Sequence, residues 1–305
     1  MTDTAALLCS QFSSQAAEQL FGTASTVKTW FLLEYEGRWE PEAFENSDLP
    51  QPVKDHVMRH SVGVPQPRIQ VIKHKPRLAP PGDIAFFVAL SRDDSPVLYE
   101  FHLSSYDDLL ALDLAAICAG DPAFEKNRRN EPLMLVCTHG RRDRCCAQNG
   151  VPIYEHIIQQ AGASVWQTSH VAGHRFAGNM VILPDGLYYG RLDPQSAQAV
   201  IDAHRAGRVV PDHYRGRSCY SKVGQVAEYF LRAKTGIGAA EPVRLIGEER
   251  GADQQWIVRF AAAGQREFVL TLAEDPAAVQ VYSSCGDAAP SAMSQFRLLD
   301  HTKNG

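Results

Sequence analysis

Residues 132–146, PLMLVCTHGRRDRCC, decide how this sequence is interpreted, together with the segment HVAGHRFAGN that follows later in the chain. The first stretch has the pattern of a short buried strand that runs into a loop bearing Cys137 and Cys146, nine positions apart. In the second, His170 and His174 stand four positions apart. Paired cysteines and histidines are typical of a metal site, which requires a fold that brings the two segments together.

The residues around these motifs predict alternating strands and helices. After the strand at 132–137 we expect a helix, a strand, a hairpin that turns at Asp185 and Gly186, and a helix; their ranges are 151–162, 164–170, 178–192 and 193–207. The same order of elements is expected earlier in the chain, at 29–36, 48–61, 68–74, 83–90, 97–103 and 105–119. Asp48 could cap the first of these helices.

The element order in each half, a βαβ unit followed by a hairpin and a closing helix, matches the thioredoxin fold. We therefore predict an α/β protein of two tandem thioredoxin-like halves with a small C-terminal β-rich appendage. The N-terminal half spans 1–120 and lacks the paired cysteines and histidines, the second half spans 131–234, and the C-terminal extension spans 235–305. The strand-like runs WIVRF, EFVLTLA and VQVYS indicate the β character of the extension.

In a βαβ unit, the loops after the two parallel strands lie at the same edge of the sheet, where open sheets place their ligands. CTHGRRDRCC fills the first of these loops and HVAGHRFAGN fills the second. A lone buried cysteine or histidine is more often a core residue than a ligand. Packing alone poorly explains four such residues at one edge, so we expect a metal site formed by Cys137, Cys146, His170 and His174.

The residues alone leave two kinds of metal centre open. Two thiolates and two imidazoles suit tetrahedral zinc, although the spacing departs from the short hooks of zinc fingers. A [2Fe–2S] cluster with two cysteines and two histidines suits them as well, although the local Rieske pattern of two Cys-x-His pairs is absent.

Thiol chemistry is a weaker alternative. A phosphate-binding Cys-x5-Arg loop is disfavoured because residue 143 is Asp143, and a disulfide between the neighbours Cys145 and Cys146 would be strained. Seven cysteines in 305 residues are too few for a disulfide framework. Core or surface thiols are expected at the isolated positions Cys9, Cys118, Cys219 and Cys285.

Composition narrows the class of protein further. With 45% hydrophobic residues the chain can bury a large core, and it has no apolar run long enough to span a membrane. Its first residues, MTDTAALLCSQF, lack the order of a secretory signal. The net charge of −5 comes with scattered basic residues. We therefore expect a cytoplasmic protein without nucleic-acid or membrane partners.

CTHGRRDRCC and HVAGHRFAGN, together with LFGTAS at 20–25 and the YYGRL hairpin, closely resemble the sucrase/ferredoxin-like family of thioredoxin-like ferredoxins. The resemblance implies a [2Fe–2S] cluster held by Cys137, Cys146, His170 and His174, and thus electron transfer between donor and acceptor proteins that the sequence does not identify. It implies an electron carrier or redox component more than a stand-alone enzyme. The alternatives are a zinc-stabilised binding module and a thiol-dependent reductase. No carboxylate pair supports sucrase activity.

Several residues in and near these motifs have further predicted roles. His139 is expected to be an outer donor to the cluster or a solvated loop residue, and LFGTAS to be a helix-capping loop. Four arginines could raise the potential of a cluster or bind an acidic partner, or simply be solvated: Arg141, Arg142, Arg144 and Arg175.

Overall fold

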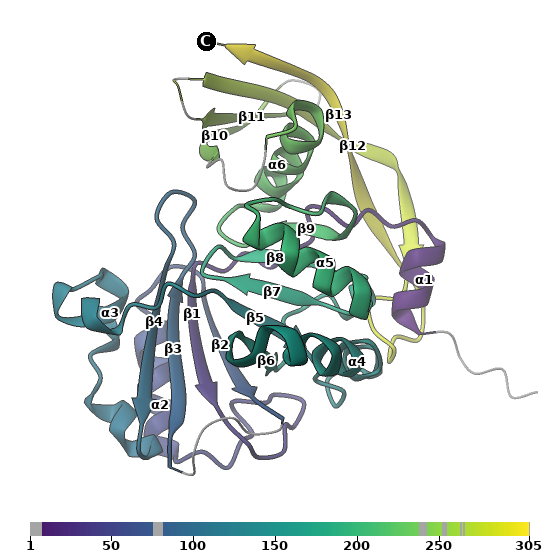
Figure 1. Cartoon of the computed structure of the whole chain (residues 1–305). Helices are drawn as coiled ribbons and strands as arrows, with labels where there is room; N and C mark the ends of the chain where they lie inside the picture. Colours follow the sequence, from purple (N-terminus) through teal and green to yellow (C-terminus); the bar gives the residue numbers. More distant parts are fainter. Residues whose placement is uncertain are drawn as a thin grey trace, which may run out of the picture.

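The computed structural model describes residues 8–75, 82–237, 243–251, 255–262, 264 and 266–304. These residues form a mixed α/β structure with one sheet of nine strands and one of four, so the expected α/β class is confirmed (Figure 1). Most of the segment inspected for a secretory signal, residues 1–7, lies outside the described residues. Across the described ranges, no helix is both long and apolar enough to cross a membrane.

Four strands of the large sheet come from the N-terminal part of the chain: β1 (Thr29–Glu34), β2 (Pro67–Lys73), β3 (Ile84–Leu90) and β4 (Val97–Leu103). The helix α2 (Gln51–Ser61) connects β1 to β2. β1 is parallel to β2 and antiparallel to β3, and all six of its residues are buried. A strand covered on both faces explains why TWFLLE is almost continuously apolar.

The other five strands follow from residue 133: β5 (Leu133–Cys137), β6 (Val165–Thr168), β7 (Met180–Leu183), β8 (Leu187–Tyr189) and β9 (Tyr214–Arg217). The helix α4 (Arg144–Ala161) connects β5 to the parallel strand β6, and α5 (Pro194–Arg205) follows β8 and packs beside α4. β7 and β8 form the expected hairpin around Asp185 and Gly186. The predicted order of elements is therefore present in both parts of the chain.

The two sets of strands join into one sheet with the order β4-β3-β1-β2-β6-β5-β7-β8-β9. The joint is a short antiparallel pairing of β2 with β6, in which Ile72 lies opposite Thr168. The curled sheet encloses a shared apolar core on its inner face, where Trp30 of β1 packs 6.0 Å from Tyr188 of β8, measured between ring centroids. The edge at which β5 and β6 end is therefore backed by residues from both parts of the chain.

Three helix boundaries differ from the sequence predictions. α2 begins at Gln51 with Pro50 at its N-cap, so Asp48 does not cap it. The helix expected at 105–119 is divided into a 3-10 helix (Tyr106–Ala111) and α3 (Leu114–Ala119), because Asp113 caps the second part by accepting from the Ala116 N–H. The helix expected from 151 begins at Arg144, where the Asp143 side chain accepts from the Cys145 N–H. Cys145 and Cys146 therefore lie in the first turn of α4 and not in a loop.

The small sheet is antiparallel and packs on α6 (Lys222–Thr235); its strands are β10 (Val243–Arg250), β11 (Trp256–Ala262), β12 (Arg266–Val281) and β13 (Ser291–Asn304). The runs EFVLTLA and VQVYS, expected as separate strands, belong largely to the single strand β12. The ribbon of β12 and β13 extends beyond the sheet to the N-terminal helix α1 (Cys9–Gln15), which the sequence did not predict (Figure 1). There Phe12 of α1 packs on Tyr282, with ring centroids 4.8 Å apart.

Candidate metal centre

The four residues expected to form a metal site lie where β5 and β6 end. Cys137 is the last residue of β5, and His170 follows the last residue of β6 by two positions. Because the two strands are parallel and adjacent, their carboxyl ends meet at one edge of the sheet. Cys146 reaches the same edge from the first turn of α4, and His174 begins a 3-10 helix (His174–Phe176) in the following loop.

Three of the four side chains lie in direct proximity. The sulfur atoms of Cys137 and Cys146 and a ring nitrogen of His170 all lie within 4.8 Å of one another. The Cys146 Sγ is 3.6 Å from the His170 Nδ1. Both thiols are buried, with 1% and 0% of their residue surface exposed. The structure thus brings together two buried thiols and one partly exposed imidazole.

His174 lies beside this group, but the set of donor atoms within 4.8 Å of one another does not include it. Its ring centroid is 4.9 Å from that of His170. The His174 Nδ1 is buried and has no hydrogen-bond partner among the described residues, while the Nε2 is 3.9 Å from the Asp143 Oδ2. A buried ring nitrogen without a partner is costly unless something outside the protein chain binds it. We use the name candidate metal centre for Cys137, Cys146, His170 and His174.

The protonation states of this centre favour metal binding. A hydrogen bond with the Cys146 thiol, and then the neighbouring His170, lower the pKa of Cys137 well below its ordinary value. The same contact with Cys137, together with burial, raises the pKa of Cys146. Burial lowers the pKa of His174. These shifts favour a thiolate at Cys137 and a neutral imidazole at His174, and metal binding would release the proton of the Cys146 thiol.

His170 is positioned by the N-terminal part of the chain. Gln70 of β2 donates from its Nε2 to the His170 carbonyl at 3.1 Å, and the Ser169 N–H donates to the Val71 carbonyl at 2.9 Å. The sequence predicted no role for Gln70, since a polar residue within an apolar strand carries no signal of its partner. The N-terminal strands thus hold one side of the site, although they contribute no thiol or imidazole to it.

Arg215 of β9 positions the loop between the two histidines. This fully buried guanidinium donates to the Ala172 carbonyl at 3.1 Å and to the Asn179 Oδ1 at 2.9 Å, while the Asn179 side chain donates to the Gly173 carbonyl at 2.9 Å. Gly173 has a φ of +73°, and a Cβ there would lie 2.3 Å from Arg215. Sequence reasoning missed Arg215, whose role depends on contacts that are distant along the chain.

The LFGTAS segment also contacts Arg215 and caps no helix. Arg215 donates to the Thr23 Oγ1 at 3.1 Å, and the Thr23 N–H donates to the Arg215 carbonyl at 3.1 Å. The expectation of a helix-capping loop is therefore wrong, because α1 already ends at Gln15.

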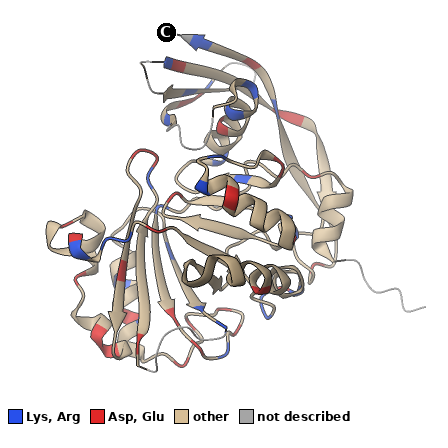
Figure 2. Cartoon of the chain, in the orientation of Figure 1, with Lys and Arg blue, Asp and Glu red and all other residues tan. Residues whose placement is uncertain are grey.

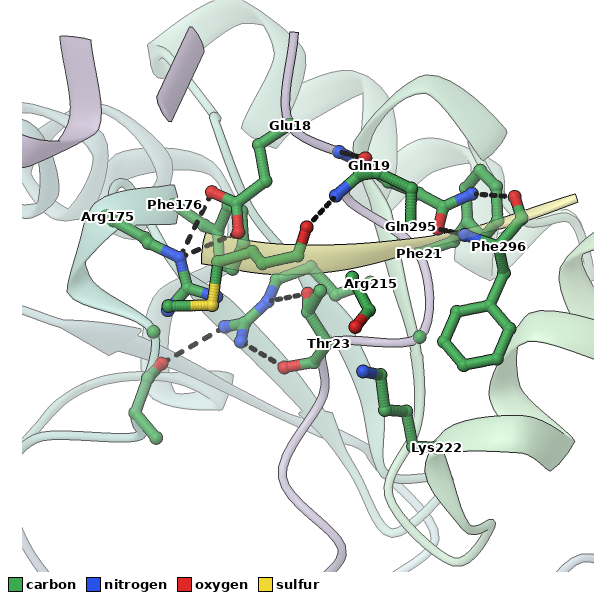
Figure 3. A pocket seen from close by; sticks show the side chains of 15 residues that line it. Glu18, Gln19, Phe21, Thr23, Arg175, Phe176, Arg215, Lys222, Gln295 and Phe296 are labelled. Carbon is green, nitrogen blue, oxygen red and sulfur yellow. Dashed lines mark hydrogen bonds and ion pairs between the residues drawn. The ribbon is translucent and has the colours of Figure 1, made fainter. Parts of the chain in front are cut away.

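A cavity of about 280 Å³ lies between the LFGTAS segment, the loop that carries His170 and His174, and the C-terminal ribbon of β12 and β13 (Figure 3). Inside it, Arg175 donates to Glu18 at 2.9 Å, so this cation is already paired.

His139 is buried, so the expectation of a solvated loop residue is wrong. Only 2% of the residue is exposed, its ring packs on Trp39 with centroids 5.7 Å apart, and neither ring nitrogen has a partner in the described part of the chain.

Two of the nearby arginines are paired at the surface, Arg141 with Glu40 and Arg142 with Glu42. Acidic and basic residues are interspersed through the structure in the same way (Figure 2).

A second group of thiols lies close by, which corrects the expectation that Cys9 and Cys285 are isolated. Their sulfur atoms meet that of Cys145, and together with a carboxylate oxygen of Asp143 these donor atoms lie within 4.8 Å of one another. We call these four residues the second thiol cluster. Cys118 and Cys219 remain separate thiols, and burial raises their pKa values to about 11 and about 12.

Two buried thiols and two histidine rings meet where the strands of a mixed α/β sheet end. The fold and these residues together define an α/β protein with a candidate metal site. The chain belongs to the sucrase/ferredoxin-like family, whose sequence model matches residues 20–216. The family resemblance of the two motifs is therefore confirmed. The match includes both motifs and ends within β9, before the small sheet.

Curated relatives named "Altered inheritance of mitochondria protein 32" are similar to parts of this chain. The relative from Meyerozyma guilliermondii is 29% identical over 147 residues, which cover 44% of this chain and 50% of the relative. The relative from Eremothecium gossypii is 27% identical over 113 residues, 32% of this chain and 36% of the relative. The chain thus spans half or less of the length of these relatives. No solved structure matches it significantly.

Proposed function

We propose that this protein is a one-electron carrier in which Cys137, Cys146, His170 and His174 hold a [2Fe–2S] cluster. The observation that carries the proposal is the meeting of two buried thiols and two imidazoles at one edge of the sheet, where the buried His174 Nδ1 has no partner among the described residues. The two parts of the large sheet would then be tandem thioredoxin-like halves, one with the ligands and one as a scaffold.

The donor atoms fit such a cluster in chemistry and in orientation. Two thiolates and two imidazoles form the ligand set of histidine-containing [2Fe–2S] centres. The His170 Nδ1 faces the Cys146 sulfur, and the His174 Nδ1 has no partner in the part of the chain that the structure describes, so both histidines would bind through Nδ1. The opposite nitrogen of His174 faces Asp143, an arrangement that orients metal-bound imidazoles in many proteins. When bound, the cluster would accept and release one electron.

Electrons would enter and leave by the histidine side of the centre. The His174 side chain is 17% exposed, whereas the two cysteines are buried beneath the sheet edge. The unidentified donor and acceptor proteins would therefore dock over the loop that carries His170 and His174. Arg141 and Arg142 are already paired with glutamates, so close approach of the partner would matter more than electrostatic steering by these two residues.

A zinc-stabilised binding module is the second candidate. The donor atoms of Cys137, Cys146 and His170 lie within 4.8 Å of one another, a spacing that one tetrahedral ion also accepts. Such a site would hold the edge of the sheet together without redox activity.

Metal analysis of anaerobically purified protein separates the two candidates. We expect a red-brown protein with two iron atoms and two acid-labile sulfides per chain, because a [2Fe–2S] cluster has that composition. After reduction with dithionite, electron paramagnetic resonance should detect one unpaired electron per chain. A colourless protein whose metal is lost with Cys137→Ser, and in which that metal is zinc, would favour the binding module.

Substitution of Cys145 tests the ligand assignment. We expect Cys145→Ser to retain iron and visible absorption, because the Cys145 sulfur lies 3.4 Å from that of Cys9 and belongs to the second thiol cluster. Cys146→Ser should lose both, since this thiol lies beside His170. The two residues are adjacent in α4, so each variant is the matched control of the other. Equal iron loss in both variants would contradict the assignment.

A further inference from the structure

The second thiol cluster unites three segments that are far apart along the chain. Cys9 begins α1, Cys145 lies in the first turn of α4, and Cys285 follows the end of β12. The sulfur of Cys145 is 3.4 Å from that of Cys9 and 3.3 Å from that of Cys285, and the sulfurs of Cys9 and Cys285 are 3.6 Å apart. The three sulfur atoms therefore form a nearly regular triangle.

The size of this triangle suits a single metal ion. A disulfide needs sulfur atoms about 2.05 Å apart, which is much closer than any pair here. Three thiolates on one tetrahedral zinc ion, with Zn–S bonds of about 2.3 Å, lie roughly 3.8 Å from one another. The observed separations of 3.3–3.6 Å are near that value. An ion just above the plane of the triangle would reach all three sulfurs.

Asp143 supplies the fourth donor. Its side chain is only 1% exposed, and its Oδ1 lies 3.9 Å from the Cys9 sulfur. The Oδ1 also accepts from the Cys145 N–H at 2.9 Å, while the Oδ2 accepts from the Cys285 N–H at 2.8 Å and from the Ser284 hydroxyl at 3.1 Å. These bonds hold the carboxylate rigidly against the triangle of sulfurs.

The charges around this carboxylate are also compatible with a bound cation. Within the described ranges, its ion-pair contacts include no lysine or arginine, only the His174 Nε2 at 3.9 Å. A buried carboxylate is costly unless it is paired or coordinates a metal, and three adjacent thiols become a favourable anionic ligand set only when a metal ion is present. The N-terminus of α4, from which Cys145 projects, adds partial positive charge that favours the thiolate form of this cysteine.

We propose that Cys9, Cys145, Cys285 and Asp143 bind one zinc ion at a structural site separate from the candidate metal centre. This ion clamps the N-terminal helix and the tip of the β12–β13 ribbon to the start of α4. Asp143 then lies between the two sites, with one oxygen toward the zinc and the other toward His174. The clamp thereby holds α1 against the 3-10 helix that begins at His174.

The test is the zinc and iron content of the full-length protein and four variants. Wild type should contain one zinc ion per chain in addition to iron. Cys9→Ser and Cys285→Ser should lose zinc and keep iron, whereas Cys137→Ser should lose iron and keep zinc. Cys118→Ser is the matched control, because this thiol belongs to neither group, and it should keep both metals.

A second measurement on wild-type protein avoids variants that fail to fold. Iodoacetamide labelling, followed by mass spectrometry of peptides, should find the partly exposed Cys285 protected until a zinc chelator is added, after which it reacts. Equal labelling with and without the chelator would overturn the proposal, as would a disulfide between any two of Cys9, Cys145 and Cys285. Zinc loss on desalting, which marks an adventitious ion only, would overturn it too.

The outcomes also distinguish this proposal from the proposed electron-transfer function. Iron and sulfide without zinc would refute the zinc site alone. Zinc that disappears with Cys137→Ser but persists in Cys9→Ser would place the ion at the candidate metal centre and refute both proposals. Zinc that follows Cys9 and Cys285 in a protein without iron would support the clamp and refute the electron carrier.

Discussion

Replacing His174 with cysteine should lower the reduction potential of the protein by at least about 100 mV. Histidine-ligated clusters of this kind lie at roughly −150 to +300 mV and plant-type all-cysteine clusters near −400 mV, so the two classes differ by about 250 mV or more. A thiolate in place of a neutral imidazole adds one negative charge, which makes the addition of an electron less favourable. His174→Cys introduces one of the two charges that separate the classes.

The measurement is a redox titration of wild type and His174→Cys, followed by visible absorption. His102→Cys is the control, because His102 is 62% exposed on β4, contacts Asp83 and belongs to neither group of candidate metal ligands. Its potential should equal that of wild type. If His174→Cys retains a [2Fe–2S] cluster at an unchanged potential, His174 is not a ligand and the proposed ligand set is wrong.

Replacing Gly150 with alanine should destabilise the protein by roughly 3 kcal/mol and reduce iron retention, because overpacking of a rigid contact costs about 1–3 kcal/mol or more. A Cβ at Gly150 of α4 would lie 2.0 Å from the carbonyl oxygen of Cys137 and 3.5 Å from the Thr138 Cα. Backbone atoms cannot rotate away as a side chain would. α4 would have to move from β5 and so separate Cys146 from Cys137.

Urea unfolding and iron analysis check this expectation. Gly63→Ala is the matched control, because a Cβ at Gly63 meets nothing within 4 Å, and it should change the free energy of unfolding by less than about 1 kcal/mol. Equal stability of the two variants would indicate that α4 and β5 tolerate separation, and the close contact would then not determine the geometry of the site.

The local pattern of apolar and polar residues was sufficient to predict most strands of the large sheet. Buried runs such as TWFLLE and LMLVC, separated by amphipathic helices, identify βαβ units, and parallel strands place their loops at one edge. The meeting of Cys137, Cys146 and His170 follows from that rule. The start of α4 differs from the predicted one because an aspartate among basic residues is as typical of a turn as of the helix N-cap that Asp143 forms.

The sequence by itself therefore determined the α/β class and the family, and it predicted the four residues of the candidate metal centre, of which Cys137, Cys146 and His170 lie together in the structure. The tertiary structure alone decided how β2 joins β6, how Gln70 and Arg215 hold the histidine loop, and how Cys9 and Cys285 reach Cys145. Periods of two and of 3.6 residues report which face of an element is buried, not which distant segment covers it. Cys145 meets partners 136 and 140 positions away, and that contact depends on the docking of α1 and of the β12–β13 ribbon.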